Sequence, residues 1–183
     1  MSQPRRTNEM LVGISAMIIS LTSLFVFIYQ TNLIRKEQYM SVYPHLNLTN
    51  AFTGSLNYKY VLQNEGVGPA FITKLHIEHR NGETYPDLLT YLEEVLQPED
   101  SVAFHYSDLY VGQLVQANET INLFGLSGKS YTDAYGLPTN TVASANKLRD
   151  ALNSDSLTIR LSYKSIYDEE WSITAESYVP QKQ

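Results

Sequence analysis

The sequence predicts a mainly β protein, with an N-terminal transmembrane helix followed by an antiparallel β-sandwich that carries two short inserted helices. Three observations support this fold class. An apolar, uncharged stretch lies near the N-terminus, apolar side chains recur at every second position over much of the remainder, and Tyr is frequent, with 14 residues. Alternation with a period of two is typical of strands that bury one face, and several short strands of this kind favour a sandwich.

The predicted membrane helix runs from Met10 to Tyr29. No charged side chain lies between Glu9 and Arg35. Twenty helical residues, rising about 1.5 Å each, cover the roughly 30 Å hydrocarbon layer of a bilayer. The ring of Tyr29 is expected at the interface. The domain organisation is therefore an N-terminal tail at 1–9, a transmembrane helix at 10–31, a juxtamembrane linker at 32–41 and a β-sandwich at 42–180.

Two other interpretations of this stretch are a buried core helix and a cleaved signal peptide. A core helix of this length carries a polar stripe, and no charged stripe is present here. A signal peptide needs small residues before its cleavage site, whereas the stretch ends in mostly large residues from Phe25 to Leu33. We therefore expect an uncleaved signal anchor.

Positive charge near the two ends of the helix predicts its orientation. Arg5, Arg6 and the terminal amine stand against Arg35 and Lys36. The side with more positive charge usually stays in the cytoplasm, so the three charges against two place the N-terminus inside and the soluble domain outside.

Four small residues, Gly13, Ala16, Ser20 and Ser23, share one stripe of this helix. Small side chains let a second helix approach closely, and hydroxyl groups can bond across the contact. The stripe predicts packing against a membrane protein partner, although Gly, Ala and Ser are common in any membrane span.

Seven strands are expected beyond the linker. They lie around Leu46–Leu48, Tyr58–Gln63, Phe71–His79, Val102–Tyr106, Thr120–Phe124, Leu157–Lys164 and Trp171–Tyr178. Turn residues such as Asn81-Gly82 separate them. Two segments have helical spacing instead, Pro86–Leu96 and Thr141–Leu152, and these are the two inserted helices.

Charge and composition exclude several classes of function. From Glu37 onward the chain has 9 basic and 18 acidic side chains, a net charge of −9. Such a domain is repelled by phosphate backbones, so we expect no nucleic-acid partner. The absence of Cys excludes disulfides, thiolate zinc sites and cysteine nucleophiles.

The segment from Val61 to Ile72 contains Asn64-Glu-Gly66-Val-Gly68-Pro69-Ala. A strand that runs into Asn-x-Gly-x-Gly-Pro-Ala and out into another strand resembles a pattern in uncharacterised bacterial membrane-anchored proteins with an immunoglobulin-like β-sandwich. The resemblance implies that fold and a bacterial inner membrane location, and it implies no activity. We expect Asn64, Gly66, Gly68 and Pro69 to form a structural turn, in which the glycines adopt backbone conformations that other residues resist.

Several motifs that suggest chemistry fail a check of spacing or context. Gly128-Lys129-Ser130 lacks the earlier glycine of a phosphate-binding loop, because Leu123 occupies that place. His76 and His79 are three apart on a strand and point to opposite faces, so they are expected to be surface residues near a turn. The adjacent Glu93 and Glu94 diverge on a helix and form no acid–base pair.

The acidic tip at Asp168, Glu169 and Glu170 is expected to be a solvated turn. We therefore predict no enzyme, no catalytic residue, no cofactor and no metal. One exposed contact surface is suggested by Tyr131, Asp133, Tyr135 and Trp171, because aromatic rings on a glycine-flanked loop suit a peptide or a sugar. An alternative is that the tyrosine rings cover the edge of the core.

The function predicted from the sequence is a membrane-anchored binding or accessory module without catalysis. Its partners would be the membrane itself and a protein bound through the span or the β-domain. The alternative is a small-ligand or glycan-binding module that uses the Tyr and Trp residues of its loops.

Overall fold

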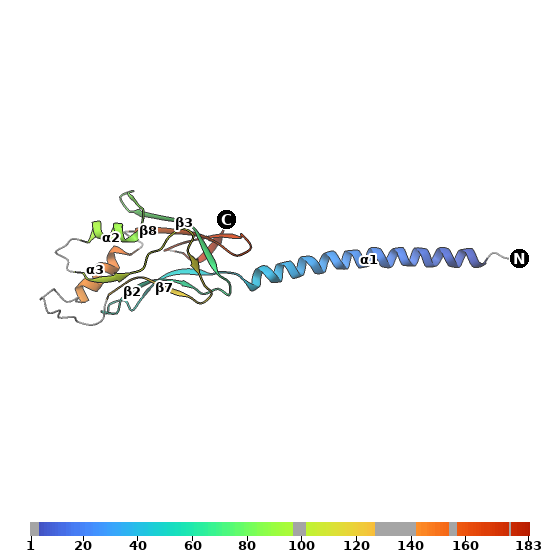
Figure 1. Ribbon diagram of the computed structural model, residues 1–183, viewed down its shortest axis with the longest axis horizontal. Helices are drawn as coiled ribbons and strands as arrows, with labels where there is room; N and C mark the ends of the chain where they lie inside the picture. Colours follow the sequence, from blue (N-terminus) through green and yellow to red (C-terminus); the bar gives the residue numbers. More distant parts are fainter. Residues whose placement is uncertain (1–3, 97–101, 127–141, 154–156, 176) are drawn as a thin grey trace. The chain divides into compact units, whose positions relative to one another are not determined.

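The computed structural model describes residues 4–96, 102–126, 142–153, 157–175 and 177–183 (Figure 1). The chain forms two compact units, Met1–Ser41 and Val42–Gln183. We call the second unit the two-sheet domain.

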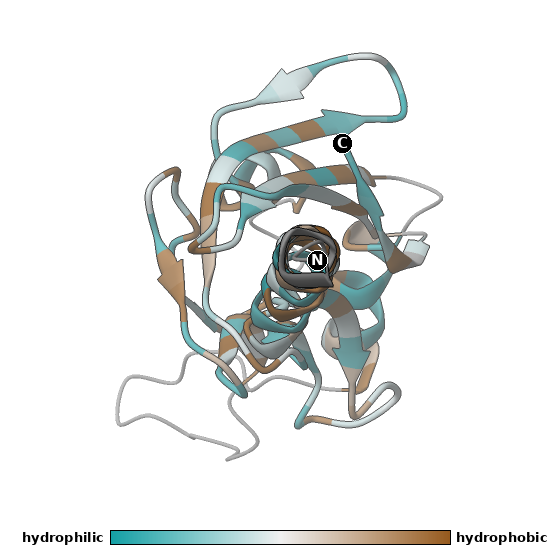
Figure 2. Cartoon of the chain, turned by 90° about the vertical axis from the view of Figure 1, so that its right-hand side faces the viewer, coloured by the Kyte–Doolittle hydropathy of each residue, from teal (hydrophilic) through white to brown (hydrophobic). Residues whose placement is uncertain are grey.

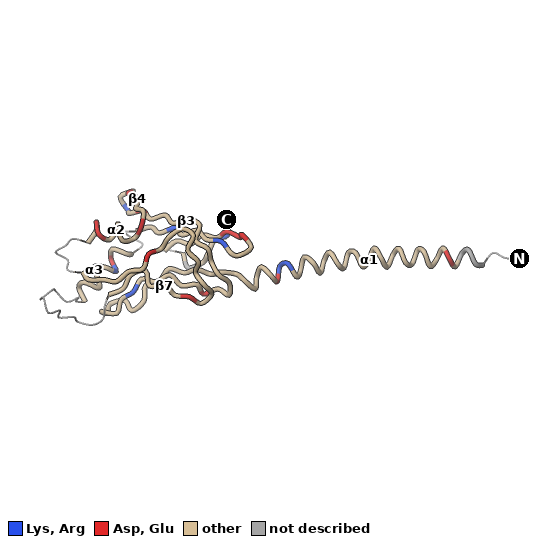
Figure 3. The backbone as a smooth tube through the Cα atoms, in the orientation of Figure 1, with Lys and Arg blue, Asp and Glu red and all other residues tan. Residues whose placement is uncertain are grey.

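The first unit is the helix α1, Pro4–Ser41. Its stretch Asn8–Ser41 is long and apolar enough to cross a membrane, and none of its most apolar window is buried in the structure. Figure 3 shows no Lys, Arg, Asp or Glu along its central part. The helix includes the juxtamembrane range 32–41, which was expected to continue the helix into water, and no helix breaker interrupts it before Ser41.

One sheet of the two-sheet domain has four strands in the order β1-β2-β7-β5. All of its pairings are antiparallel. The burial of β1 alternates between its two faces, with Leu46 and Leu48 buried, as the sequence pattern predicts. The strands are β1 (Leu46–Ala51), β2 (Lys59–Asn64), β7 (Thr120–Leu126) and β5 (Phe104–Tyr106).

The other sheet has six strands in the order β10-β9-β8-β3-β4, with β6 also paired to β3. Its pairings are antiparallel too. The strands are β10 (Ser177–Lys182), β9 (Glu170–Thr174), β8 (Leu157–Lys164), β3 (Ala70–His79), β4 (Thr84–Tyr85) and β6 (Leu114–Val115). Figure 2 shows apolar and polar residues alternating along several of the strands.

One hydrophobic core joins the two sheets. It contains Leu48 and Leu62 from the first sheet and Ile77, Leu161 and Ile173 from the second. Burying this apolar surface stabilises the fold by about 25 cal/mol for each Å² removed from water. The domain is thus mainly β, with antiparallel sheets.

Two further helices lie beside each other at one end of the domain (Figure 1). The first, α2 (Leu88–Val95), begins after Asp87, whose carboxylate accepts a hydrogen bond of 2.7 Å from the backbone N–H of Thr90. Such an N-cap satisfies a donor that the first turn leaves open. The second, α3 (Val142–Ala151), is held to α2 by a 2.7 Å hydrogen bond from the Tyr91 hydroxyl to the carbonyl of Ala151. With α1, the described residues form three helices.

The described strands number ten, against the seven expected. The range Trp171–Tyr178, predicted to be one strand, is divided between β9 and β10, which pair with each other. The short strands β4 and β6 are also additional. Two residues give too little alternation to indicate a strand, so their pairing with β3 is set by tertiary contacts.

Candidate functional site

A buried and extensively hydrogen-bonded feature of the described domain is the Asn64 turn, which we define as residues 64–69. It joins β2 of the first sheet to β3 of the second. Asn64 is fully buried. Its side-chain oxygen accepts hydrogen bonds from the backbone N–H groups of His45 (3.1 Å) and Gly66 (3.0 Å). A buried amide with such partners fixes the turn firmly, because each group would otherwise lie unpaired away from water.

The Asn64 amide nitrogen extends this network to another part of the chain. It donates to the carbonyls of Gly68 (2.8 Å), Gln116 (3.0 Å) and Val115 (3.2 Å). Residues 116–119 carry the chain from β6 in one sheet to β7 in the other. One side chain therefore ties together two connections between the sheets.

The Asn64 turn also binds the leading segment, which we define as residues 42–45, the first residues of the domain after α1. The carbonyl of Tyr43 accepts hydrogen bonds from the N–H groups of Val67 (3.0 Å) and Gly68 (3.3 Å). The carbonyl of His45 accepts from the N–H of Glu65 at 2.8 Å. Together with the bond from His45 N–H to Asn64, these contacts fix the leading segment to the domain before β1 begins.

Gly66 and Gly68 are needed because the backbone of the leading segment passes very close to them. The expectation that these glycines adopt backbone conformations which other residues resist is therefore wrong. Neither has a φ angle in the left-handed region, whereas Gly54, Gly82 and Gly112 do. A Cβ on Gly66 would overlap the backbone of Tyr43 and His45, and a Cβ on Gly68 would overlap the backbone of Val42. The absence of a side chain lets the leading segment lie directly against the turn.

Aromatic side chains hold the leading segment from the opposite sheet. The hydroxyl of Tyr163 accepts from the N–H of Leu46 (3.4 Å) and donates to the carbonyl of Pro44 (3.5 Å). Burial raises the pKa of Tyr163 above its ordinary value, so the hydroxyl stays protonated at neutral pH. The ring of Tyr43 meets that of Trp171 edge to face, with 5.0 Å between ring centroids.

Trp171 belongs to this packing, although it was expected on an exposed contact surface. It is only 5% exposed. The ammonium of Lys182 lies 5.2 Å from its ring centroid and forms an ion pair of 2.6 Å with Glu169. The remaining members of the predicted contact surface, Tyr131, Asp133 and Tyr135, lie outside the described residues, as does Gly128-Lys129-Ser130.

The acidic tip is an exposed turn between β8 and β9, and two of its carboxylates also pair with lysines. Asp168 lies 2.5 Å from Lys164, in addition to the pair between Glu169 and Lys182. The pKa of Lys164 is raised mainly by its hydrogen bond to Asp168. Among the described residues, no group of three or more His, Asp or Glu side chains is placed to hold a metal ion.

The two histidines of β3 have separate surroundings. His76 is exposed and lies 3.2 Å from Glu78. His79, expected on the surface, instead packs on Tyr91 with 5.8 Å between ring centroids, and its Nδ1 is buried. The reason is the position of α2, which covers this end of β3 and which strand periodicity does not reveal.

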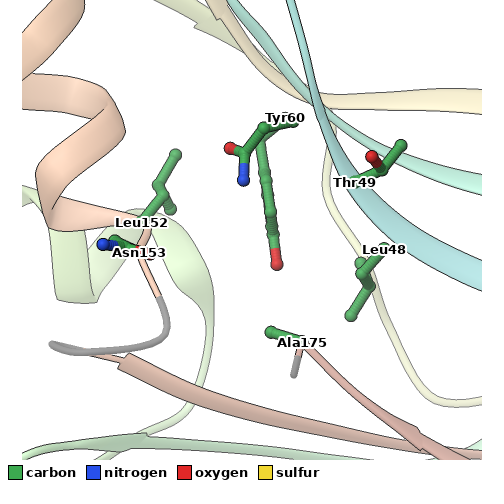
Figure 4. A pocket seen from close by; sticks show the side chains of 7 residues that line it. Leu48, Thr49, Tyr60, Leu152, Asn153 and Ala175 are labelled. Carbon is green, nitrogen blue, oxygen red and sulfur yellow. The ribbon is translucent and has the colours of Figure 1, made fainter. Parts of the chain in front are cut away.

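A polar cavity of about 170 Å³ is the feature that sequence reasoning missed. It is lined by Leu48, Thr49, Asn50, Tyr60, Leu152, Asn153 and Ala175. Figure 4 shows the Tyr60 ring passing between Leu152 and Asn153 on one side and Leu48 on the other, with its hydroxyl toward Ala175. The alternation of β2 predicts a buried Tyr60, but no sequence signal indicates that space remains around its hydroxyl.

The small-residue stripe of α1 is exposed along its whole length. A side chain at Gly13 would meet nothing within 4 Å, and the hydroxyl of Ser20 donates to the carbonyl of Ala16 at 2.8 Å. Such an internal bond satisfies the hydroxyl within its own helix.

No protein-family model, no curated protein and no solved structure shows a significant match to the chain.

Proposed function

We propose that this chain is a single-pass membrane protein whose uncleaved helix anchors a non-catalytic binding or accessory domain beside the bilayer. The observation that carries the proposal is the attachment of the leading segment. Helix α1 ends at Ser41, and the hydrogen bonds that fix the leading segment begin at Tyr43. A recognition surface on the domain would therefore be joined to the anchor through the leading segment, which is itself fixed to the domain.

The composition of α1 supports the anchor. Its apolar side chains face all directions, as expected for a helix whose surroundings are lipid. The helix also continues for twelve residues beyond Tyr29, to Ser41. A cleaved signal peptide would instead end its apolar stretch in small residues and a loop. In this proposal the membrane is a bacterial inner membrane, and the domain lies outside the cytoplasm.

The two antiparallel sheets around one core support the finer proposal of an immunoglobulin-like sandwich. In such folds the loops at the ends of the sheets commonly carry binding surfaces, while the strands form a rigid support. This arrangement fits recognition better than catalysis.

The anchor is tested by placing charges in the centre of α1. Ile18→Lys together with Ile19→Lys should cost about 2.5–3.5 kcal/mol per lysine on transfer into the bilayer. We expect the wild-type chain to remain in the membrane pellet after alkaline carbonate extraction and the double variant to leave it. Thr53→Lys with Asn81→Lys adds the same charge to the exposed domain surface and should not change the distribution. A wild-type chain that is released, or whose intact mass lacks α1, would refute the anchor.

The accessory role is tested on the stripe of small residues. Gly13→Leu with Ser20→Leu fills the stripe, whereas Ser15→Leu with Thr22→Leu adds comparable bulk to the other side of the helix. We expect quantitative mass spectrometry to show membrane proteins that co-purify with the wild type and the control but not with the stripe variant. Equal co-purification in both variants would remove the span from the interface.

A further inference from the structure

The Asn64 turn presents an apolar side chain beside the leading segment. Val67 is 65% exposed, and its backbone N–H donates to the carbonyl of Tyr43 at 3.0 Å. The buried side chain of Asn64 fixes the turn through its bonds to Gly66 and Gly68. An exposed valine on a turn that is already fixed can contact a partner without a further loss of conformational entropy.

A second fixed turn presents two more exposed apolar side chains. It joins β8 to β9, and we define it as the Ser165 turn, residues 165–169. Ser165 is buried, its hydroxyl accepts a 3.2 Å hydrogen bond from the N–H of Tyr167, and its own N–H donates to the carbonyl of Glu169 at 3.0 Å. Ile166 and Tyr167, which follow Ser165, are 47% and 42% exposed.

The leading segment lies between the two turns. The hydroxyl of Tyr163, two residues before the Ser165 turn, donates to the carbonyl of Pro44. The ring of Trp171, two residues after that turn, packs against Tyr43, whose carbonyl accepts from the N–H of Val67. Both turns therefore flank the point at which the chain enters the domain. We call their three exposed apolar side chains the apolar tips: Val67, Ile166 and Tyr167.

The length of chain after the proposed membrane span lets the apolar tips reach lipid. The span ends at Tyr29, and α1 continues to Ser41, directly before the leading segment. These twelve residues add at most about 18 Å along the helix axis, and the headgroup layer occupies roughly 5–7 Å of that distance. Any tilt of the helix shortens the remainder. By chain length, the end of the domain with the apolar tips is the part held closest to the bilayer.

The charges around the apolar tips favour one kind of lipid surface. Asp168 and Glu169 pair with Lys164 and Lys182. Two further carboxylates, Glu65 and Glu170, are exposed beside the two turns and leave this surface with a net negative charge. Anionic headgroups repel such a surface, whereas the ammonium group at the outer end of a zwitterionic headgroup attracts it.

We propose that the apolar tips dock on the zwitterionic phospholipid surface of the bilayer that holds α1. Val67 and Ile166 enter the boundary between headgroups and acyl chains, where they lose contact with water. The ring of Tyr167 lies at the headgroup level, where amphipathic aromatic rings are enriched. This inference rests on the proposed anchor and adds that the domain lies against the membrane, on whichever side it is placed.

Quenching of a fluorescent dye by spin-labelled lipid tests this contact in the full chain. The chain has no cysteine, so Ile166→Cys and Thr53→Cys each provide a unique thiol for a nitrobenzoxadiazole dye. Thr53 is exposed in the loop after β1, whereas the leading segment precedes β1. In nanodiscs of phosphatidylcholine with a nitroxide at carbon 5 of one acyl chain, the dye at 166 should lose at least about half of its fluorescence. The dye at 53 should keep its fluorescence.

Two double variants connect the quenching at 166 to the other apolar tips. Val67→Ser with Tyr167→Ser should lower it by at least about half, because the docking strength depends on the apolar area buried in lipid. The matched control, Phe52→Ser with Val142→Ser, removes two equally exposed apolar side chains elsewhere and should leave it unchanged. Circular dichroism checks that each variant is folded. Phosphatidylglycerol mixed into the bilayer should weaken the quenching at low salt, and added salt should restore it.

Co-elution of the chain with the nanodisc reports on the anchor separately. A chain that co-elutes but shows no quenching at 166, equal quenching at 53, or unchanged quenching in Val67→Ser with Tyr167→Ser would overturn the docking and leave the anchor in place. Quenching that increases with phosphatidylglycerol would overturn the assignment to a zwitterionic surface. A chain that does not co-elute with the nanodisc would overturn the anchor and the docking together.

Discussion

Replacement of Asn64 should be among the most damaging single substitutions in the two-sheet domain. Asn64→Ala removes the acceptor of the His45 and Gly66 N–H groups. Each buried donor left unpaired costs about 1–3 kcal/mol. The three backbone carbonyls that accept hydrogen bonds from the Asn64 amide nitrogen also lose this donor, although each can still accept other hydrogen bonds. We expect the free energy of unfolding to fall by about 3–5 kcal/mol, a large share of the roughly 5–15 kcal/mol of an ordinary domain.

Urea denaturation of the full chain in nanodiscs, followed by Trp171 fluorescence, measures this change. Trp171 is the sole tryptophan and contacts Tyr43 in the leading segment, so its emission reports release of that segment. Asn47→Ala is a matched control, since Asn47 lies half-buried on β1 and its side chain makes no hydrogen bond to the described residues. A loss below about 0.5 kcal/mol in Asn64→Ala, the range of ordinary surface changes, would refute the role assigned to Asn64.

Asn64→Asp separates hydrogen bonding from packing. The introduced carboxyl group keeps an acceptor for the two N–H groups, but its second oxygen faces three carbonyls. Burial and these dipoles raise its folded pKa above the ordinary value of about 3.9, so the neutral form is favoured in the fold. The variant should therefore be most stable below about pH 4 and lose stability as the pH rises through its raised pKa. A variant whose stability relative to wild type does not change with pH would contradict this reasoning.

Further predictions concern the glycines and the tyrosines. Gly68→Ala forces the backbone of Val42 to move and should lower the free energy of unfolding by at least about 2 kcal/mol in the same urea assay, whereas Gly13→Ala, in open space, should leave it unchanged. Burial raises the pKa of Tyr91 to about 12. The stabilisation of the fold by this neutral hydroxyl is therefore complete below pH 10, the ordinary tyrosine pKa, and is lost between pH 10 and 12. Ionisation of such a tyrosine should lower the free energy of unfolding by about 1.4 kcal/mol per pH unit in that range. A urea midpoint that stays constant from pH 9 to 12 would contradict this prediction.

Residues on regular strands were predictable because burial on one face leaves a direct trace in the sequence. Leu157, Ile159 and Leu161 alternate with polar residues, and all three are buried in β8. The same rule works less well from Trp171 to Tyr178, where the alternation holds through Trp171, Ile173 and Ala175 but not at Ser177, and β9 and β10 pair with each other instead of forming one strand. Periodicity identifies strand faces, but it does not locate a turn that lacks Gly or Pro.

The surroundings of the candidate site were less predictable, because they depend on contacts between distant residues. The motif around Asn64 indicates a turn, but not that the turn binds the leading segment some twenty residues earlier. Trp171 looks like an exposed ring beside an acidic tip until Tyr43 and Lys182 are seen against it. The cavity at Tyr60 depends on how β1, β2, α3 and the end of β9 fit together, and no local pattern encodes that fit.

Cysteine labelling tests the central claim, an uncleaved anchor with its domain outside the cytoplasm. The chain has no cysteine, so Thr53→Cys places a unique thiol on an exposed loop between β1 and β2. In spheroplasts of cells that express the variant, a membrane-impermeant maleimide should label a chain that retains α1 by intact mass and stays in the membrane pellet. Label on a shortened, soluble chain would contradict the anchor, and protection of the thiol until lysis would contradict the orientation.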